Sequence, residues 1–346
     1  MGERRDAVIH PPTHPPGARC HSSIHPSIHP SITSPCPVST PLSTPLATHD
    51  PTAMSASRED QLTYLFGHAT SESERLNFQQ ELFNALFPGR EYVHSAEYDV
   101  SRAHRVLDTA TGTGVWLERL ARDGQGGKRL PANVQLEGSD IVLDKVTAKG
   151  TPIDFSVHDV LQPFPQEQHG KYDLVQMRYV LMAMNSEQYA TAIRNLYALL
   201  KPGGTLQVVE LDPRPAAPRN ETEHFIKDMF DGLWSRANKD PPGICRDMQA
   251  HLRTAGFSSV HVQTSSWPWG RVAQEMGLSK EVMLKSVANT TFAFKALKGP
   301  ILFFADKAPV AGVTSEAIFD QRAEDIERFY LEIGFSSDLY IGIAVR

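Results

Sequence analysis

The sequence predicts a doubly wound α/β fold built on a mostly parallel, seven-stranded sheet. Three observations predict it. From residue 105 onward, short apolar runs with the length of strands alternate with longer amphipathic runs with the length of helices. The first apolar run is followed by a glycine-containing loop that leads directly into a helix. The chain has 346 residues, 40% of them hydrophobic, which is enough to bury a sizeable core.

The expected elements follow one another in a regular order. Strands are expected at residues 105–108, 134–139, 153–158, 172–177, 205–211, 260–265 and 340–345. Helices are expected at residues 61–87, 115–122, 186–200, within 213–256, and at 273–297 and 314–333. The segment Lys201-Pro202-Gly203-Gly204 is expected to be a turn. Such alternation is typical of a parallel sheet that helices cover on both faces.

The chain is expected to have three parts. Residues 1–53 are rich in Pro, Ser, Thr and His and offer little apolar surface to offset chain entropy, which predicts a disordered low-complexity tail. Residues 54–100 are expected to form a helical lid, and Met54 is an alternative start of the chain. Residues 101–346 are expected to form the main α/β domain, with helical insertions at 213–256 and 271–333 that cap a substrate.

Charge and cysteine content exclude several classes of protein. The tail carries three arginines against three acidic residues, so the net charge of −6 belongs to the rest of the chain and argues against nucleic-acid binding. The three cysteines, one of them Cys245, form no C-x-x-C pair, which argues against a zinc site or a disulfide framework. No apolar run has the roughly 18 residues of a membrane span. We expect a cytoplasmic protein with no metal, no membrane association and no nucleic-acid partner.

The strongest motif is V-L-D-T-A-T-G-T-G at residues 106–114. Glycines let a ligand approach the backbone, and the helix that follows offers free N–H groups. A dinucleotide fingerprint would continue G-x-G-x-x-G, whereas Leu117 stands at the third glycine position. Asp108 at the end of the strand would repel a pyrophosphate and attract a cation. The motif therefore favours a cationic nucleoside ligand.

These residues resemble the first motif of the class I S-adenosylmethionine-dependent methyltransferases, which share a Rossmann-like fold. The match is complete except that Ala110 replaces the first glycine, a mild departure because alanine adopts most loop conformations. The resemblance implies that Asp108 lies near the amino-acid part of S-adenosyl-L-methionine. It implies that Gly112 and Gly114 line the nucleoside.

Four further segments fall where the resemblance requires them: L-E-G-S-D-I at 136–141, V-H-D-V at 157–160, Y-D-L-V-Q-M-R-Y-V-L-M at 172–182 and L-L-K-P-G-G-T-L at 199–206. Asp140 would bind the ribose diol, and Asp159 would meet the adenine amine, although a helix cap for Asp140 and a turn for Asp159 are open alternatives. Arg75 would close over the methionine carboxylate or pair with Glu72 or Glu74 on its own helix. The cofactor-binding residues that the resemblance implies are Tyr64, Arg75, Asp108, Ala110, Gly112, Gly114, Ser139, Asp140, Ile141, His158, Asp159, Val160, Met177 and Arg178.

The chain lacks the marks of several methyltransferase subclasses, such as N/D-P-P-Y/F after the fourth strand. It resembles the fungal small-molecule methyltransferases of secondary metabolism and the ubiquinone/menaquinone-type group. Three segments carry this resemblance: Y-x-F-G…E-R-L-x-x-Q at 64–79, Y-D-L-V-Q-M-R-Y-V-L-M at 172–182, and W-P-W-G at 267–270.

The expected function is therefore methyl transfer to an O, N or S atom of a small, largely apolar metabolite. A base is needed only if the acceptor must lose a proton, and the candidates are His224, Glu210, Asp212 and Tyr179. Aromatic and Met residues of the lid and insertions suit an apolar substrate, although each is equally well explained by core packing. The alternatives are a non-catalytic regulator that acts through a protein partner and a nucleotide-dependent dehydrogenase.

Overall fold

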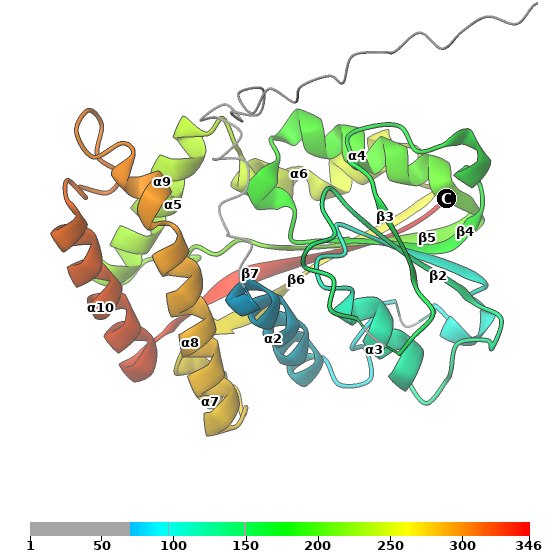
Figure 1. Ribbon diagram of the computed structural model, residues 1–346, viewed down its shortest axis with the longest axis horizontal. Coiled ribbons are helices and arrows are strands. Elements are labelled where there is room, and N and C mark those ends of the chain that lie inside the picture. The colour runs from blue at the N-terminus through cyan, green and yellow to red at the C-terminus, as the bar shows by residue number, and fades with distance from the viewer. Residues whose placement is uncertain (1–69, 96, 149) are drawn as a thin grey trace, which may run out of the picture. The chain divides into compact units, whose positions relative to one another are not determined.

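The sheet has seven strands in the order β3-β2-β1-β4-β5-β7-β6, and six of them are parallel (Figure 1). The computed structural model describes residues 70–95, 97–148 and 150–346. The expected tail, Met54 and Tyr64 lie outside these residues. Only β7 is antiparallel, and it pairs with β5 and β6. The strands are β1 Arg105–Thr109, β2 Gln135–Asp140, β3 Asp154–Val157, β4 Tyr172–Arg178, β5 Leu200–Leu211, β6 Ser259–Trp269 and β7 Phe335–Val345. The predicted fold class is confirmed.

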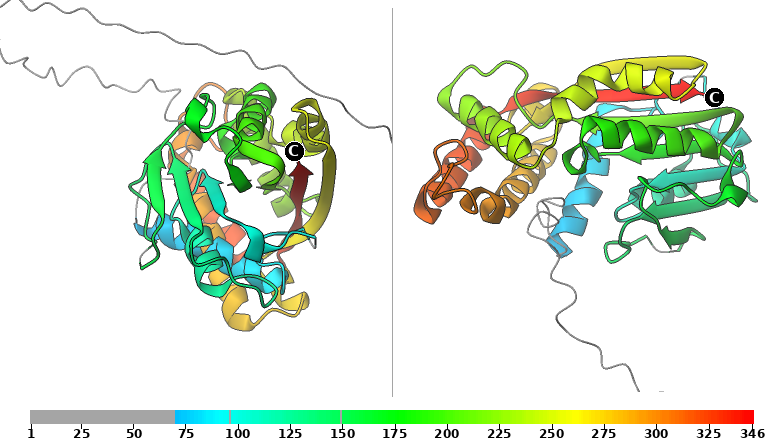
Figure 2. Two further views of the ribbon diagram at one scale, coloured as in Figure 1. Left: turned by 90° about the vertical axis from the view of Figure 1, so that its right-hand side faces the viewer. Right: turned by 90° about the horizontal axis from the view of Figure 1, so that it is seen from above.

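Helices cover both faces of the sheet (Figures 1 and 2). One face carries α4 (Ser186–Leu199) and α6 (Pro241–Thr254), and the other carries α2 (Thr70–Leu86) and α3 (Val115–Asp123). The start of α4 is set by a capping box, in which the Asn185 and Gln188 side chains each accept the other's backbone N–H. The start of α6 combines an Asp240 cap with proline in the first turn.

A cluster of helices lies beyond the carboxyl ends of the parallel strands, at the left of Figure 1. It consists of α5 (Glu221–Arg236), α7 (Val272–Glu275), α8 (Lys280–Ala296), α9 (Lys298–Leu302) and α10 (Glu316–Glu332). We call it the helical cap. Its apolar side chains share one core with α2 and with the ends of β5, β6 and β7. None of the helices in the described part of the chain is long and apolar enough to cross a membrane.

The structure corrects several expected boundaries. The segment Lys201–Gly204 is not a free turn but a bulge inside β5, because Tyr172 pairs with Leu200 while Leu174 pairs with Thr205. Gly203 takes a positive φ of 79° there, and its N–H donates to the Arg346 carbonyl. Strand β6 runs on through Trp269 because the first half of β7 pairs with it. Pro268 is tolerated within β6 because this strand is at the edge of the sheet.

Candidate active site

A cavity of about 390 Å³ opens at the carboxyl ends of the strands. Its walls come from the loop after β1, the ends of β2, β4 and β5, helix α2 and the helical cap. Open α/β sheets bind ligands at this edge. The volume is within the range of small-molecule sites.

The loop after β1 is held by two hydrogen bonds to the end of β2 and by one to Asp108 at the end of β1. The Thr111 N–H donates to the Ser139 carbonyl at 3.0 Å, and the Gly112 N–H donates to the Asp140 carboxylate at 2.8 Å. The Thr111 hydroxyl donates to Asp108 Oδ2 at 2.8 Å. The loop that the motif predicts is therefore rigidly placed against the two acidic residues predicted beside it.

The glycines of the loop are required by its backbone. Gly112 and Gly114 have φ values of 58° and 76°, and Gly114 is the N-cap of α3. A Cβ atom at Gly114 would lie 2.7 Å from the Phe155 ring. Glycine at both positions lets the helix begin directly under the loop.

Of the two acidic residues, Asp108 is buried and Asp140 is half-buried in the cavity wall. Asp108 is only 2% exposed, and burial raises its pKa to about 6, although nearby Arg178 acts in the opposite direction. Burial also raises the pKa of Asp140, against the backbone N–H groups that bond to it. A buried carboxylate gains most from a cationic partner. The side-chain Oε1 of Gln79, another cavity residue, is buried with no hydrogen-bond partner and can accept from an ammonium group.

Ala110 lies in the same loop with a φ of 52°. The left-handed region costs a residue with a Cβ atom roughly 1–2 kcal/mol. The sequence interpretation of Ala110 as a mild departure from glycine therefore underestimates its effect on the backbone.

Replacing Ala110 with glycine should stabilise the protein by up to about 1 kcal/mol, because relief of strain exceeds the added entropy of the unfolded chain. Thermal unfolding should show a rise in Tm of roughly 2–4 °C. Gly114→Ala is the matched control, since it places a Cβ at positive φ against Phe155, and it should lower Tm. An unchanged or lowered Tm for Ala110→Gly would show that the loop is not strained.

The next part of the cavity wall is formed by residues that follow β2 and β3. Ile141, His158, Asp159 and Val160 all line it. Asp159 Oδ1 accepts from the Leu161 N–H at 2.9 Å, so the turn considered for Asp159 is present. Asp140 caps no helix, because its oxygens accept from the N–H groups of Gly112 and Ile141.

Not every predicted cofactor residue faces the cavity. Arg75 lines it, but its guanidinium bonds to Glu72 at 2.7 and 2.8 Å, which is the alternative pairing considered for it. Ser139 and Met177 are buried within their strands and are absent from the cavity wall. Asp108 and Gly114 lie behind the loop residues that form the wall. Arg178 lines the cavity and donates to Gln80 Oε1 at 2.5 Å.

The candidate bases differ sharply in position. His224 is exposed on α5 and does not line the cavity, so the structure gives it no access to a substrate there. Tyr179 lines the cavity with its backbone at a φ of 57°, and burial raises its pKa to about 12. Its hydroxyl has no hydrogen-bond partner among the described residues. A buried tyrosine with such a pKa is a poor base at neutral pH.

Glu210, at the end of β5, is fully buried behind the cavity wall. Its carboxyl group accepts from the N–H groups of Val180 and Leu181 at 3.4 and 3.1 Å, at the start of the turn η3 (Leu181–Ala183). Burial raises its pKa to about 8. A mostly protonated carboxyl group behind the wall positions that turn and does not reach a substrate.

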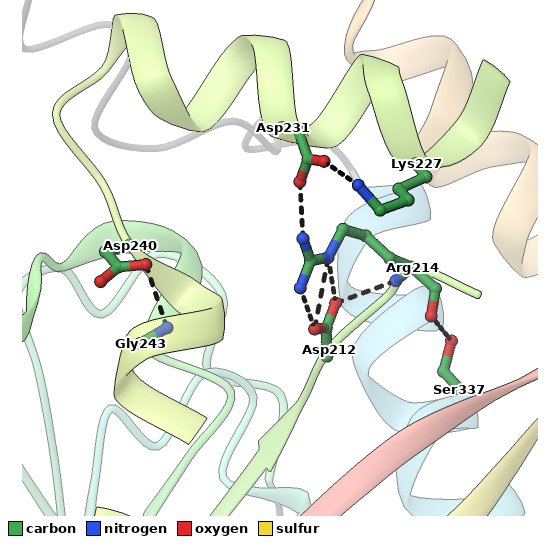
Figure 3. A network of polar contacts seen from close by, with 7 residues as sticks. All are labelled: Asp212, Arg214, Lys227, Asp231, Asp240, Gly243 and Ser337. Carbon is green, nitrogen blue, oxygen red and sulfur yellow. Dashed lines mark hydrogen bonds and ion pairs between the residues drawn. The ribbon is translucent and has the colours of Figure 1, made fainter. Parts of the chain in front are cut away.

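Asp212 belongs to an ion-pair network (Figure 3). Arg214 bonds to Asp212 at 2.7 Å and to Asp231 on α5 at 2.6 Å, and Lys227 also contacts Asp231. The Ser337 hydroxyl of β7 donates to the Arg214 carbonyl. The network fastens α5 to the end of the sheet, so Asp212 has a structural partner and does not line the cavity.

Several cavity residues were not predicted as site residues, and two groups of polar side chains are among them. Gln79 and Gln80 on α2 line the wall, and the E-R-L-x-x-Q segment that includes Gln79 was the available signal. Ser286, Asn289 and Thr290 on α8 also line it. Nothing in the local sequence of α8 distinguishes them from ordinary surface polar residues. Of the predicted aromatic and Met residues, those on the wall are Met229, Phe230, Trp267, Trp269 and Phe294.

The strand order with an antiparallel β7, the glycine loop after β1 and the acidic residues after β2 and β3 define a class I methyltransferase architecture. The model of the methyltransferase domain family matches residues 106–204. The chain is 31% identical to methyltransferase grgD of Penicillium sp over 218 residues, which cover 62% of this chain and 74% of that protein. The chain belongs to the S-adenosylmethionine-dependent methyltransferase family.

Two other relatives bear on the subgroup. The chain is 29% identical to N-methyltransferase verN of Clonostachys rogersoniana over 58% of this chain and 68% of that protein. It is 26% identical to the secondary metabolism regulator LAE1 of Pyricularia oryzae over 62% of this chain and 66% of that protein. The chain is thus similar both to named methyltransferases and to a named regulator.

Proposed function

We propose that this protein transfers a methyl group from S-adenosyl-L-methionine to an O, N or S atom of a small, largely apolar metabolite of secondary metabolism. The observation that carries the proposal is that one cavity joins the glycine loop and Asp140 to an apolar chamber in the helical cap. The similarity to verN favours nitrogen as the acceptor atom. The proposal includes a cytoplasmic location, on the sequence grounds given above.

The residues at the sheet end of the cavity fit this cofactor. The Gln79 carbonyl oxygen, which is buried in the cavity wall without a hydrogen-bond partner among the described residues, would accept from its ammonium group. Asp108, behind the loop, would make the potential at that end of the site favourable for a cation. Asp140 would accept from its ribose hydroxyls. Ile141 and Val160 would cover the adenine, with Asp159 at its amine. When bound, S-adenosylmethionine supplies a methyl group that its sulfonium already activates.

The protein's own contribution would be alignment and exclusion of water. Tyr179 and the turn at Leu181–Ala183, held by Glu210, lie between the loop after β1 and the apolar chamber. Among the described cavity residues, no carboxylate or histidine lies in that chamber to act as a base. This favours an acceptor that attacks without a dedicated base on the protein.

The similarity to LAE1 and the lack of a clear base favour a second candidate, a methyltransferase-like regulator that acts through a protein partner. It would bind cofactor without turning over small molecules. The two candidates differ in turnover and not in cofactor binding.

Calorimetry with S-adenosylhomocysteine tests the proposed function. We expect dissociation constants in the micromolar range and no binding of NAD or NADP. Incubation with methyl-labelled cofactor and a panel of fungal metabolite extracts should then label small molecules. Binding without any labelled product, together with a stable protein partner in pull-downs, would favour the regulator. Absence of S-adenosylhomocysteine binding would contradict both candidate functions, the methyltransferase and the cofactor-binding regulator.

A further inference from the structure

The cavity has a charged end and an uncharged end. Among the described residues that line it, those with charged or ionisable acidic or basic side chains are Arg75, Asp140, His158, Asp159 and Arg178. They come from α2 and from the loops and strand ends near the glycine loop, and Arg75 and Arg178 are engaged by Glu72 and Gln80. The end within the helical cap has no such side chain in the described part of the chain.

The walls of the uncharged end are large and apolar. They come from α5, β6 and α8, and include Ile226, Met229, Phe230, Trp267, Trp269 and Phe294. Most of these side chains belong to the core that joins the cap to the sheet. Packed helices and strands therefore form the chamber, so the side chains that line it are in place before a ligand binds.

A polar strip interrupts these walls on one face of α8. Ser286, Asn289, Thr290 and Ala293 follow the spacing of one helix face, and all four line the cavity. The Thr290 hydroxyl is used internally, because it donates to the Ser286 carbonyl at 2.7 Å. Ser286 is only 2% exposed, and Asn289 is partly exposed. Two neutral polar groups therefore face an apolar chamber.

Tyr330 adds a neutral phenol to the same chamber, and Trp267 adds an indole N–H that is buried with no hydrogen-bond partner among the described residues. Tyr330 extends from α10 and lines the cavity. Burial raises its pKa, so the phenol stays neutral. Together these groups can donate to and accept from a ligand, but they cannot neutralise a charge.

We propose that the uncharged end selects a neutral apolar molecule bearing an amide, carbonyl or hydroxyl group, which Asn289 and Ser286 hydrogen-bond and so orient toward the charged end. A buried ligand carboxylate or ammonium would lose its water and gain no counter-charge, which is strongly unfavourable. A neutral polar group would instead exchange hydrogen bonds with these side chains at a much smaller desolvation cost. Asn289 is then the specificity-determining residue. This inference rests on the proposed function, because it concerns the acceptor end of that site.

Matched probes on one scaffold test the charge selection. Naphthalene-2-carboxamide, naphthalene-2-carboxylate and 2-naphthylmethylamine differ in charge and little in shape. Their binding to the full chain saturated with S-adenosylhomocysteine can be titrated by ligand-observed NMR. We expect the amide to bind at least roughly tenfold more tightly than either charged probe.

Substitutions on α8 test the role of Asn289. Asn289→Ala should weaken binding of the amide roughly tenfold, and Asn289→Asp should shift the preference to the amine. Thr291→Val is the control, because Thr291 is on the same helix, is buried and does not line the cavity, and it should leave all three affinities unchanged. Affinity for S-adenosylhomocysteine should stay the same in every variant, which verifies the fold.

Three results would overturn the inference: equal affinity for the three probes, no measurable affinity for the amide, or an Asn289→Ala variant that binds like the wild type. If S-adenosylhomocysteine binds and one of these results is found, the proposed function stands and only the substrate class is wrong. If S-adenosylhomocysteine does not bind, the proposed function fails, and the order of probe affinities can still be measured on the free protein.

Discussion

Replacing Asp140 with alanine is expected to weaken binding of S-adenosylmethionine by roughly 10- to 100-fold. The Asp140 carboxylate lines the cavity and holds the Gly112 and Ile141 N–H groups at 2.8 Å. The substitution removes a charged acceptor for the cofactor and also the bond that fixes the glycine loop. A hydrogen bond to a charged group contributes about 1.5–3 kcal/mol, which corresponds to this range. Isothermal titration calorimetry measures the change directly.

Asp108→Asn tests the other buried carboxylate and should also reduce affinity by roughly tenfold or more. The wild-type pKa of about 6 adds a pH dependence. A cationic ligand favours the carboxylate, so affinity should fall as the pH drops below about 6, and the Asn variant should show less of this fall. Asp154→Ala, an exposed change on neighbouring β3, is the control and should bind normally. Unchanged affinity in both Asp108→Asn and Asp140→Ala would mean that the cofactor does not bind at this loop.

The central strands and the glycine loop could be predicted because their signal is local. A strand buried on both faces is apolar, and Asp108 follows such a strand, in which Val106 and Leu107 are buried. Asp140 and Asp159 follow β2 and β3, which are more polar and more exposed, so their positions were implied by the order of the motifs. Parallel strands bring their carboxyl ends to one edge, so the three residues had to lie near one another. The hydrogen bond from Gly112 to Asp140 is the direct outcome of that topology.

Features that depend on distant partners could not be predicted. His224 was a candidate base, but α5 buries the neighbouring Glu223 and Phe225 and turns His224 to solvent. Successive helix residues differ by about 100° in direction, so an unknown rotation of α5 decides the exposure of each one. The polar strip of α8 is similar: Asn289 becomes a cavity residue only because α2, α5 and β6 enclose that face of the helix.

Arg75 shows a different limit. Both a cofactor contact and an ion pair on its own helix fitted the sequence. The structure has the pair with Glu72, which is itself fully buried. A buried carboxylate without its partner is costly, so Glu72 requires this contact, and burial of Glu72 cannot be read from the helix pattern.

Glu210→Gln should raise the stability of the protein, and the gain should grow with pH. Burial raises the pKa of Glu210 from an ordinary 4.5 to about 8 in the folded protein. Between these values the unfolded chain releases the proton while the folded protein keeps it, so the wild type loses stability as pH rises, by about 1.4 kcal/mol per pH unit. Glutamine keeps an oxygen for the Val180 and Leu181 N–H groups and never ionises.

Urea unfolding of both proteins at several pH values measures this effect. Near pH 4.5 the two should have similar free energies of unfolding, and above about pH 8 the Gln variant should be more stable by about 3–5 kcal/mol. Glu223→Gln is the control: Glu223 is equally buried but paired with Arg219 at 2.9 Å, so losing its charge should not stabilise the protein. A difference between wild type and Glu210→Gln that stays constant with pH would show that Glu210 is ionised in the fold. In that case a charged residue, and not a neutral one, would hold the turn beside Tyr179.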